Sequence, residues 1–598
     1  MATIIKSEQT IPIDEPFKVT AGPGAGKTHW LINHIKNVVS NSHKLDVVRK
    51  VACITYTNVG IDTITSRLNM GNDVVEVCTI HSFLYANIVK PYIHLVAKEF
   101  GLELSKLVVI DDSNFKSEGI AISVLKLINK SWVNVRSYLQ GLNNATWHYS
   151  NLAYNDYKPR FPIKFGKWFV GNDCYMGFKR WLWSRGYMSF DDILYFSQIL
   201  LSRYPNIYTL IKARYPYIFV DEFQDTIPFV IDLLAKLGNE GIIVGVVGDK
   251  AQSIYDFLGA TVQQFDSFTV PEMQEYEIRG NRRSTKQIID LLNIVRTDFS
   301  QDWLNGSEGM MPELLVGDML NCYQQCIEKS GTDEIQSLAF QNILANSMRK
   351  KNGVREVENI LEMDFDSNAE RQMVIKALIK AVEYTRMNDL RNAWHQLDII
   401  DRDRIQTIVL LRYLLDGYKD YKDGSLMDFY NFLVNDLHVE ITKIKGTAIR
   451  DFYQNHTYAD AALGVKYCDS NNKHKTIHKS KGEEYDNVFV VLKEEKDLEF
   501  LLSPNLNDNN SHRVYYVAAS RAINRLFICV PTLSAEKRIQ LEGMPINILP
   551  PQKKQPIRFG TDLTYWLKVA PRSSYFHYRQ SPQCRSAELA SDEVVSSL

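Results

Sequence analysis

The stretch that decides the fold is residues 17–28, which read FKVTAGPGAGKT. A short apolar run leads into a glycine-rich turn, and an apolar-periodic segment that includes Trp30, Leu31 and Ile35 follows. This order predicts a strand, a loop and then a helix. Glycines in such a loop let backbone N–H groups close around phosphate oxygens at the start of the helix. The sequence therefore predicts a phosphate-binding loop.

Two side chains of this loop have expected roles in binding a nucleoside triphosphate. Lys27 would reach the β- and γ-phosphates, and the Thr28 hydroxyl would ligate Mg²⁺. The rest of the expected phosphate cradle consists of Ala21, Gly22, Pro23, Gly24, Ala25 and Gly26. The usual pattern has glycine where Ala21 stands. The alternative is a glycine-rich turn that matches the pattern by chance, and the strand–loop–helix context disfavours it.

A second signal, residues 217–225, reads YIFVDEFQD and runs from a buried-strand pattern into acidic residues. Asp221 at the end of that strand can hold Mg²⁺, and Glu222 can polarise an attacking water. The plainer alternative is a strand that ends in a solvated acidic loop. Together with the phosphate-binding loop, the acidic pair predicts an ATPase that turns over rather than a slow nucleotide switch.

Bulk properties limit the remaining possibilities. A chain of 598 residues is too long for one core, so three or four domains are expected. The net charge of −1 shows no global basic field, although a groove can still be basic. The eight cysteines form no CxxC pair, which argues against a zinc or disulfide framework and favours the cytoplasm. The sequence contains no run of 18 apolar residues, so we expect no membrane span.

Further motifs resemble those of the UvrD/Rep helicases of superfamily 1A, and they follow that family's order from about Gln9 to Arg521. Residues 221–225 resemble motif II. The other matches are residues 54–58 (ITYTN, motif Ia), 78–83 (CTIHSF, Ib), 190–192 (FDD), 248–255 (GDKAQSIY, III), 281–284 (NRRS, IV), 476–485 (TIHKSKGEEY, V) and 516–522 (YVAASRA, VI).

The resemblance implies an α/β fold with two RecA-like P-loop domains, 1A and 2A, and two inserted, mainly helical subdomains, 1B and a reduced 2B. It also implies that Gln252 senses the γ-phosphate and that Arg283 and Arg521 reach it from the second domain. Gln9 and Glu484 complete the expected nucleotide-binding set. ATP and Mg²⁺ are the implied ligands.

The same resemblance places a strand of single-stranded or tailed DNA along motifs Ia, Ib, III and V. The residues expected to contact DNA are Thr57, Asn58, Thr79, His81, Phe83, Tyr255, Phe257 and His478.

The chain departs from the family pattern at positions that couple ATP to DNA. Arg282 replaces the aromatic that stacks on adenine, although a guanidinium can also stack on a base. The family's WRGA reads FLGA here, at residues 257–260, so one coupling arginine is missing. Ser520 replaces threonine in motif VI. These changes leave ATP hydrolysis expected and make processive unwinding less so.

The spacing of the motifs suggests domain boundaries. We expect domain 1A at residues 1–86 and 205–272, 1B at 87–204, 2A at 273–345 and 440–548, and 2B at 346–439. Residues 549–598 would form a mobile or partner-docking tail. Basic–aromatic stretches at 164–169 and 179–183 fit either single-strand binding or amphipathic helices with solvated lysines.

Three functions remain open at this stage. The first is an ATP-driven single-strand translocase or 3′→5′ DNA helicase. The second is a DNA-stimulated ATPase subunit of a Gabija-type antiphage system, whose partner would be an OLD/TOPRIM-type nuclease. The third, a P-loop ATPase without a nucleic-acid role, leaves motifs Ia, Ib, III and V unexplained.

Overall fold

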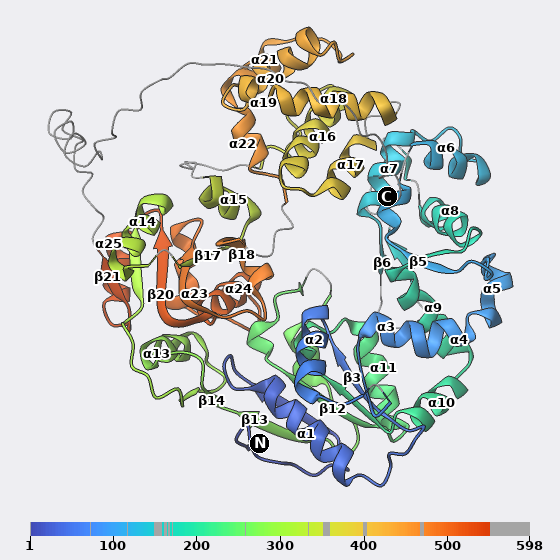
Figure 1. The fold of residues 1–598 in the computed structure, drawn as a ribbon, viewed down its shortest axis with the longest axis vertical. Helices are drawn as coiled ribbons and strands as arrows, with labels where there is room; N and C mark the ends of the chain where they lie inside the picture. Colours follow the sequence, from blue (N-terminus) through green and yellow to red (C-terminus); the bar gives the residue numbers. More distant parts are fainter. Residues whose placement is uncertain are drawn as a thin grey trace, which may run out of the picture. The chain divides into compact units, whose positions relative to one another are not determined.

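The computed structural model describes residues 2–549 except residues 72, 117, 149–157, 161–163, 166–167, 170, 257–258, 333, 351–358, 399–403 and 467–471. The described residues form two α/β bodies, each around a parallel sheet, which we call lobe 1 and lobe 2, and each lobe carries an insertion (Figure 1). The expected tail and Phe257 lie outside the described residues.

Lobe 1 is built on a seven-stranded sheet of order β1-β13-β2-β12-β11-β3-β4, in which every pairing is parallel. Its strands are β1 (Thr3–Ile4), β2 (Phe17–Ala21), β3 (Val51–Thr55), β4 (Val75–Thr79), β11 (Tyr217–Val220), β12 (Ile243–Gly248) and β13 (Gln274–Ile278). Parallel sheets are buried on both faces, which explains why the central strands β3, β11 and β12 read as near-continuous apolar runs.

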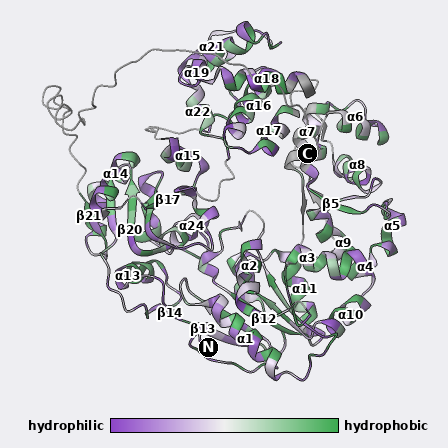
Figure 2. Ribbon diagram, viewed as in Figure 1, coloured by the Kyte–Doolittle hydropathy of each residue, from purple (hydrophilic) through white to green (hydrophobic). Residues whose placement is uncertain are grey.

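Strand β11 shows how both faces of the lobe 1 sheet are covered. Phe219 packs in the core that contains α1 (Lys27–Asn41) and α2 (Asn58–Leu68). Ile218 packs in the opposite core, which contains α11 (Pro228–Asn239). Figure 2 shows hydrophobic residues along the central strands and mixed colours around the covering helices. The strand–loop–helix predicted around Lys27 is confirmed.

The boundary between the lobes falls later than expected. Strand β13 pairs in parallel with β2, with Gln274 opposite Phe17, so it belongs to the lobe 1 sheet. The sequence places the start of the second domain at residue 273, because a strand that is largely exposed carries little apolar signal. We therefore propose that lobe 1 extends through Ile278.

Lobe 2 contains a six-stranded parallel sheet of order β18-β17-β19-β20-β16-β21. Its strands are β16 (Glu313–Val316), β17 (Gln336–Ala339), β18 (His474–Thr476), β19 (Tyr485–Val491), β20 (Ala522–Val530) and β21 (Asn547–Leu549). Helices α13 (Lys286–Val295) and α24 (Asn510–Ala519) pack in one core with β19 and β20. The described sheets and helices match the predicted α/β class.

The insertion in lobe 1 shares a core with the sheet that carries it. One cluster of buried residues includes Ile54 of β3, Val124 of α6 (Glu118–Leu127) and Trp183 of α8 (Asn172–Trp183). Lys179 of α8 is fully buried and paired with Asp192 at 3.1 Å. The stretch 179–183 is therefore part of a helix that packs in the core through Lys179, Leu182 and Trp183. The side chains of 164–169 lie outside the described residues.

The insertion in lobe 2 is helical and has its own core. Its helices include α16 (Ala369–Arg386), α17 (Leu390–Asp398), α18 (Arg404–Asp416), α20 (Leu426–Asn431), α21 (Thr447–Asn455) and α22 (Tyr458–Ala462). The buried cluster runs from Ile360 to Val465, past the expected limit of residue 439. We therefore propose that α21 and α22 belong to this insertion and not to lobe 2.

Candidate nucleotide site between the two lobes

The glycine-rich loop of residues 22–26 joins the end of β2 to the start of α1. Gly24 has φ +70°, and a Cβ there would come within 2.3 Å of Asn281 Oδ1 in the other lobe. Only glycine tolerates both this backbone conformation and this close approach. Lys27 Nζ donates to the Ala21 carbonyl at 3.3 Å, across the mouth of the loop. The loop geometry fits a phosphate cradle.

The acidic pair lies directly beside this loop. Thr28 Oγ1 donates to Asp221 Oδ2 at 3.0 Å, which brings together two oxygen ligands of the kind that Mg²⁺ prefers. Burial, aided by the charge of Glu222, raises the pKa of Asp221 to about 6. Lys27 compensates the charge of this carboxylate only in part, so a divalent cation fits this position. Glu222 itself has φ +53°, a strained conformation for a side chain other than glycine.

Cations around Glu222 keep it ionised. Burial alone would raise its pKa, but Lys27 and Lys481 hold the pKa of Glu222 below its ordinary value. Gln224 donates a hydrogen bond to the same carboxylate. A carboxylate that stays ionised can accept a proton from water.

Lobe 2 contributes two arginines to the site. Arg283 donates to Glu484 at 2.7 Å and to the Ser520 carbonyl at 3.1 Å. Arg521 is 2% exposed, and its Nη2 donates to Gln252 Oε1 at 3.0 Å. Burial, together with repulsion from Arg283, lowers the pKa of Arg521 to about 10. Arg521 is a buried cation whose charge is only partly compensated, and such a group favours an anion beside it.

The N-terminal segment meets motif IV at the edge of the loop. Arg282 donates to Ser7 Oγ at 2.5 Å and pairs with Glu8 at 2.8 Å. The indole N–H of Trp30 in α1 donates to the Gln9 carbonyl at 3.0 Å. Gln9 and Arg282, the two residues expected near the base, are therefore held on the same side of the phosphate loop.

Three further cations of lobe 2 bind residues of motif III. They are not among the site residues that the sequence predicts. Lys481 donates to both carboxylate oxygens of Asp225 and, at 2.7 Å, to the Gln252 carbonyl. Arg513 donates to the Ser253 carbonyl at 2.6 Å and pairs with Asp256. Arg296 pairs with Asp249 at 2.8 Å.

A weak sequence signal existed for Arg513. It begins the run RVYYVAASR in a helix whose neighbouring residues are apolar, and an arginine in such a helix needs a buried partner. Lys481 lies within the motif V match, although the sequence assigns it no role and no partner. Arg296 belongs to none of the motifs.

The expected DNA-contacting residues of motifs Ia and Ib lie at the carboxyl ends of neighbouring strands. Thr57 and Asn58 are exposed at the start of α2, and Thr79 caps α3 (Ile80–Leu84). His81 lies edge-on to the ring of Phe190, with centroids 6.0 Å apart. Phe190 is 54% exposed. This edge of a parallel sheet is where ligands usually bind.

Tyr255 and His478 form part of an aromatic row that crosses the lobes. Tyr255 stacks on Tyr56 with centroids 5.3 Å apart, and its ring lies 6.1 Å from that of His478. Phe340, which follows β17, stacks on His478 at 5.7 Å. Aromatic rows of this kind suit base stacking.

Phe83 requires a correction. It is 1% exposed, and its ring packs 5.5 Å from that of Tyr215 in the lobe 1 core. The last residue of the motif Ib match therefore anchors α3 and does not contact a DNA strand. Its alternation with exposed Ser82 gave a signal that sequence reasoning overlooked.

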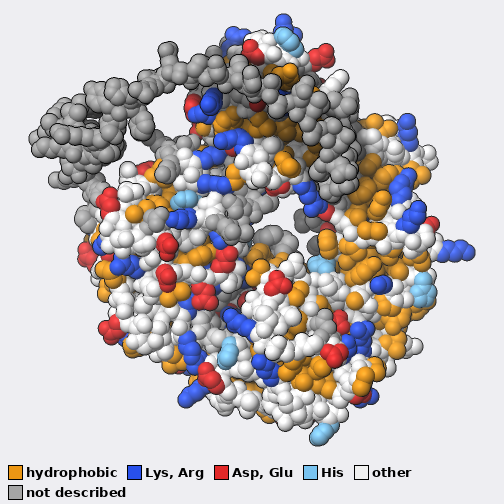
Figure 3. Space-filling view, viewed as in Figure 1, with side chains coloured by type: hydrophobic (Ala, Val, Ile, Leu, Met, Phe, Trp, Pro, Cys, Tyr) orange, Lys and Arg blue, Asp and Glu red, His pale blue; other side chains and the backbone are white. Residues whose placement is uncertain are grey.

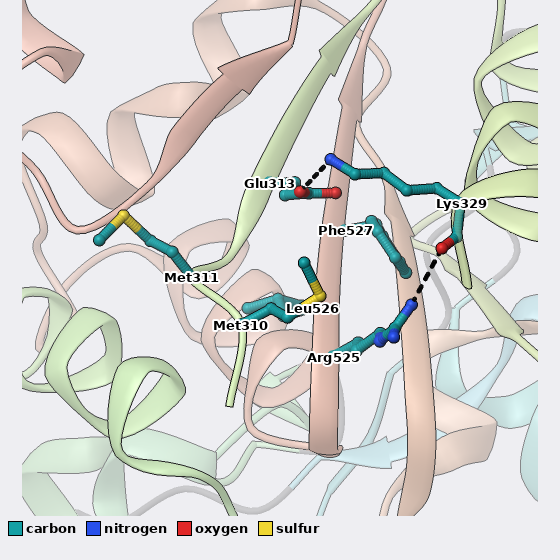
Figure 4. Close-up of a pocket in the computed structure, with 7 residues that line it drawn as sticks. All are labelled: Met310, Met311, Glu313, Lys329, Arg525, Leu526 and Phe527. Carbon is teal, nitrogen blue, oxygen red and sulfur yellow. Dashed lines mark hydrogen bonds and ion pairs between the residues drawn. The ribbon is translucent and has the colours of Figure 1, made fainter. Parts of the chain in front are cut away.

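One further surface feature among the described residues is a pocket. A small pocket on lobe 2 contains none of the motif residues and is lined by Met310, Met311, Glu313, Lys329, Arg525, Leu526 and Phe527 (Figure 4). On the face drawn in Figure 3, basic and acidic side chains are interspersed. Among the described residues no helix is long and apolar enough to cross a membrane.

The fold and the site define a class: a P-loop protein whose nucleotide site takes residues from two parallel-sheet lobes. Residues 4–271 match the UvrD/REP helicase N-terminal domain, and residues 319–532 match the UvrD-like helicase C-terminal domain. The chain therefore belongs to the UvrD/Rep-like helicase family.

Curated relatives share part of the chain. The Gabija protein GajB of Bacillus cereus is 29% identical in an alignment that covers 48% of this chain and 48% of that protein. The ATP-dependent DNA helicase PcrA of Staphylococcus epidermidis is 26% identical over 55% of this chain and 44% of its own length. PcrA of Staphylococcus aureus is 26% identical over 54% of this chain and 43% of its own length. The matches thus span about half the length of these relatives.

Proposed function

We propose that this protein is an ATP-driven translocase on single-stranded DNA with 3′→5′ helicase activity. The observation that supports this most is the contact between Arg521 of lobe 2 and Gln252 of lobe 1, at 3.0 Å, beside the phosphate loop. It links the nucleotide site to the motif that ends in Tyr255, which stands in the aromatic row. Membership of the UvrD/Rep-like family, which includes proteins named DNA helicases, supports the same activity.

Each charged group then has a role in hydrolysis. Lys27 binds the β- and γ-phosphates, and Glu222 orients water and accepts its proton. Arg283 and Arg521 stabilise charge on the transferred phosphoryl group, an effect typically worth about 10³–10⁵ in rate. Mg²⁺ held by Thr28 and Asp221 would neutralise charge on the phosphate oxygens. Because the arginines come from lobe 2, ATP draws the lobes together and hydrolysis releases them.

A strand-displacement assay tests this proposal. We expect the protein to unwind a duplex with a 3′ single-stranded tail in an ATP-dependent way and to leave a 5′-tailed duplex intact. The variant K27A serves as the control for ATP dependence. Absence of both unwinding and single-strand-stimulated ATP hydrolysis would contradict the proposal.

A second function is favoured by the similarity to the Gabija protein GajB. In this alternative, the chain is a DNA-stimulated ATPase subunit of a nuclease-containing antiphage complex, and its partner is an OLD/TOPRIM-type nuclease. DNA would then stimulate ATP hydrolysis strongly while the isolated chain unwinds duplexes only weakly. Stable co-purification with such a nuclease supports this alternative, and rapid unwinding by the isolated chain contradicts it.

A further inference from the structure

Asp249 connects the groups proposed to act on the γ-phosphate. It follows β12 directly, and its side chain is fully buried. Its backbone N–H donates to Gln224 Oε1 at 2.9 Å, and Gln224 in turn donates to the Glu222 carboxylate. Gln252 Nε2 donates to Asp249 Oδ2 at 2.7 Å. One aspartate therefore joins the proposed base to the proposed γ-phosphate sensor.

Asp249 also fixes which way the Gln252 amide points. An ionised carboxylate only accepts hydrogen bonds, so it binds the amide NH₂ and leaves the amide oxygen on the opposite side. That oxygen accepts from Arg521 Nη2 at 3.0 Å. If Asp249 moved or lost its charge, Gln252 could turn its NH₂ towards the guanidinium, and the contact would become repulsive.

Arg296 holds Asp249 in place from the other lobe. It lies at the carboxyl end of α13, in lobe 2, and its Nη1 is 2.8 Å from Asp249 Oδ1 and 2.9 Å from Oδ2. Its other face binds Asp298 through Nε at 2.7 Å and Nη2 at 3.1 Å. The side chains of Arg296 and Asp249 both have 0% exposure. A guanidinium that is bound by two carboxylates fixes the position of each carboxylate more specifically than a single point charge would.

We propose that Arg296 is a positioning residue for ATP hydrolysis, which acts through Asp249 to orient Gln252 towards Arg521. The inference rests on the proposed function. It adds a condition to that function: the sensor glutamine is correctly oriented only while lobe 2 contacts Asp249. When the lobes separate, Arg296 moves away from Asp249, so the orientation of Gln252 depends on contact between the lobes.

The alternative is that the pair serves stability alone, and a matched control separates the two. Arg371 of α16 forms a comparable buried pair with Asp366, at 2.6 Å, inside the helical insertion and away from the nucleotide site. The variants to compare are R296M, R296K, R371M, Q252A and the double variant Q252A/R296M. Steady-state ATP hydrolysis is measured with single-stranded DNA, and thermal unfolding is followed in parallel.

We expect R296M to lower kcat about 100-fold, as small misplacements of reacting groups do, with KM for ATP unchanged. R296K should recover part of kcat, and R371M should keep it. Because Arg296 acts through Gln252, Q252A/R296M should be no slower than Q252A. If kcat of Q252A/R296M fell by the product of the two single losses, or if R371M lost as much kcat as R296M, the inference about Arg296 would be wrong while the proposed function would stand. A wild-type chain without ATP hydrolysis would overturn the proposed function and this inference with it.

Discussion

Lobe 1 and lobe 2 bring opposite charges to their shared surface. Around motif III, lobe 1 supplies acceptors, and lobe 2 supplies donors with positive charge. Pairs of this kind include Asp225 with Lys481, Asp249 with Arg296, Gln252 with Arg521, and Asp256 with Arg513. The formal net charge of −1 conceals this pattern, because the complementary charges nearly cancel over the whole chain.

The difference shows why neither lobe alone makes a hydrolytic site. Lobe 1 carries the phosphate loop, the proposed Mg²⁺ ligands and the proposed base, whereas the arginines that would stabilise the transition state come from lobe 2. Motif III is the part of lobe 1 on which four lobe 2 cations converge. Electrostatic complementarity of this kind fixes how two surfaces align. Changes on either side should therefore have distinct and predictable effects.

The largest effect is expected in lobe 1, from E222Q. The glutamine keeps the shape of Glu222 but cannot accept a proton, so we expect hydrolysis to fall by about 10³-fold or more while ATP stays bound. ATP turnover and filter binding of labelled ATP measure the two effects. E542Q, at an exposed site in lobe 2, serves as the control. Near-normal turnover of E222Q would mean that the base is misassigned.

R521A removes charge from the lobe 2 side. We expect a loss of about 10³-fold in kcat with little change in ATP affinity, because Arg521 would act mainly on the transition state. Single-turnover hydrolysis measures the loss in the chemical step, and equilibrium binding measures the ATP affinity. A variant whose defect lies only in ATP binding would place Arg521 in ground-state recognition instead.

K481M tests the cross-lobe ion pair as a stabilising element. Asp225 is 1% exposed, and burial, opposed by Lys481, raises the pKa of its carboxyl to about 7. Removing one partner of a buried pair typically costs about 3–5 kcal/mol. The double variant D225N/K481M removes the unpaired charge and should recover most of that loss. Urea unfolding measures it, and equal stability of K481M and the wild type would show that the pair contributes nothing.

The smallest effect is a pH dependence inside lobe 1. Burial lowers the pKa of His34 in α1 from 6.5 to about 4, and neither ring nitrogen has a hydrogen-bond partner among the described residues. Below pH 6.5 the unfolded chain binds a proton that the folded chain refuses, so stability falls as pH drops towards 4. The slope is at most about 1.4 kcal/mol per pH unit.

The variant H34L should lose this dependence, whereas H29L, at an exposed position on the same helix, should keep it. Urea midpoints between pH 4.5 and 7 provide the comparison. Parallel pH profiles for H34L and the wild type would contradict the assignment.

Sequence reasoning succeeded where the chemistry is local. The loop before Lys27 and the strand before Asp221 can be predicted because glycine spacing and strand periodicity are patterns of a few consecutive residues. It failed for contacts between distant segments: Arg296 meets Asp249 across 47 residues, and Arg513 meets Ser253 across 260. No periodicity reports which buried acid an arginine will find.

The same limit explains the errors of placement. The motif match carried Phe83 into the DNA-contacting set, although its position in α3 turns it into the core. The sequence assigns strand β13 and helices α21 and α22 to other domains, because the local pattern does not show that β13 pairs with β2 or that α21 and α22 pack in the core of the helical insertion.

We propose that ATP is hydrolysed between the two lobes under the control of single-stranded DNA. Steady-state ATP hydrolysis by the wild-type chain and K27A, with and without single-stranded DNA, tests it most directly. We predict that DNA stimulates the wild type and that K27A is inactive under both conditions. Hydrolysis that ignores DNA, or that persists in K27A, would contradict the account.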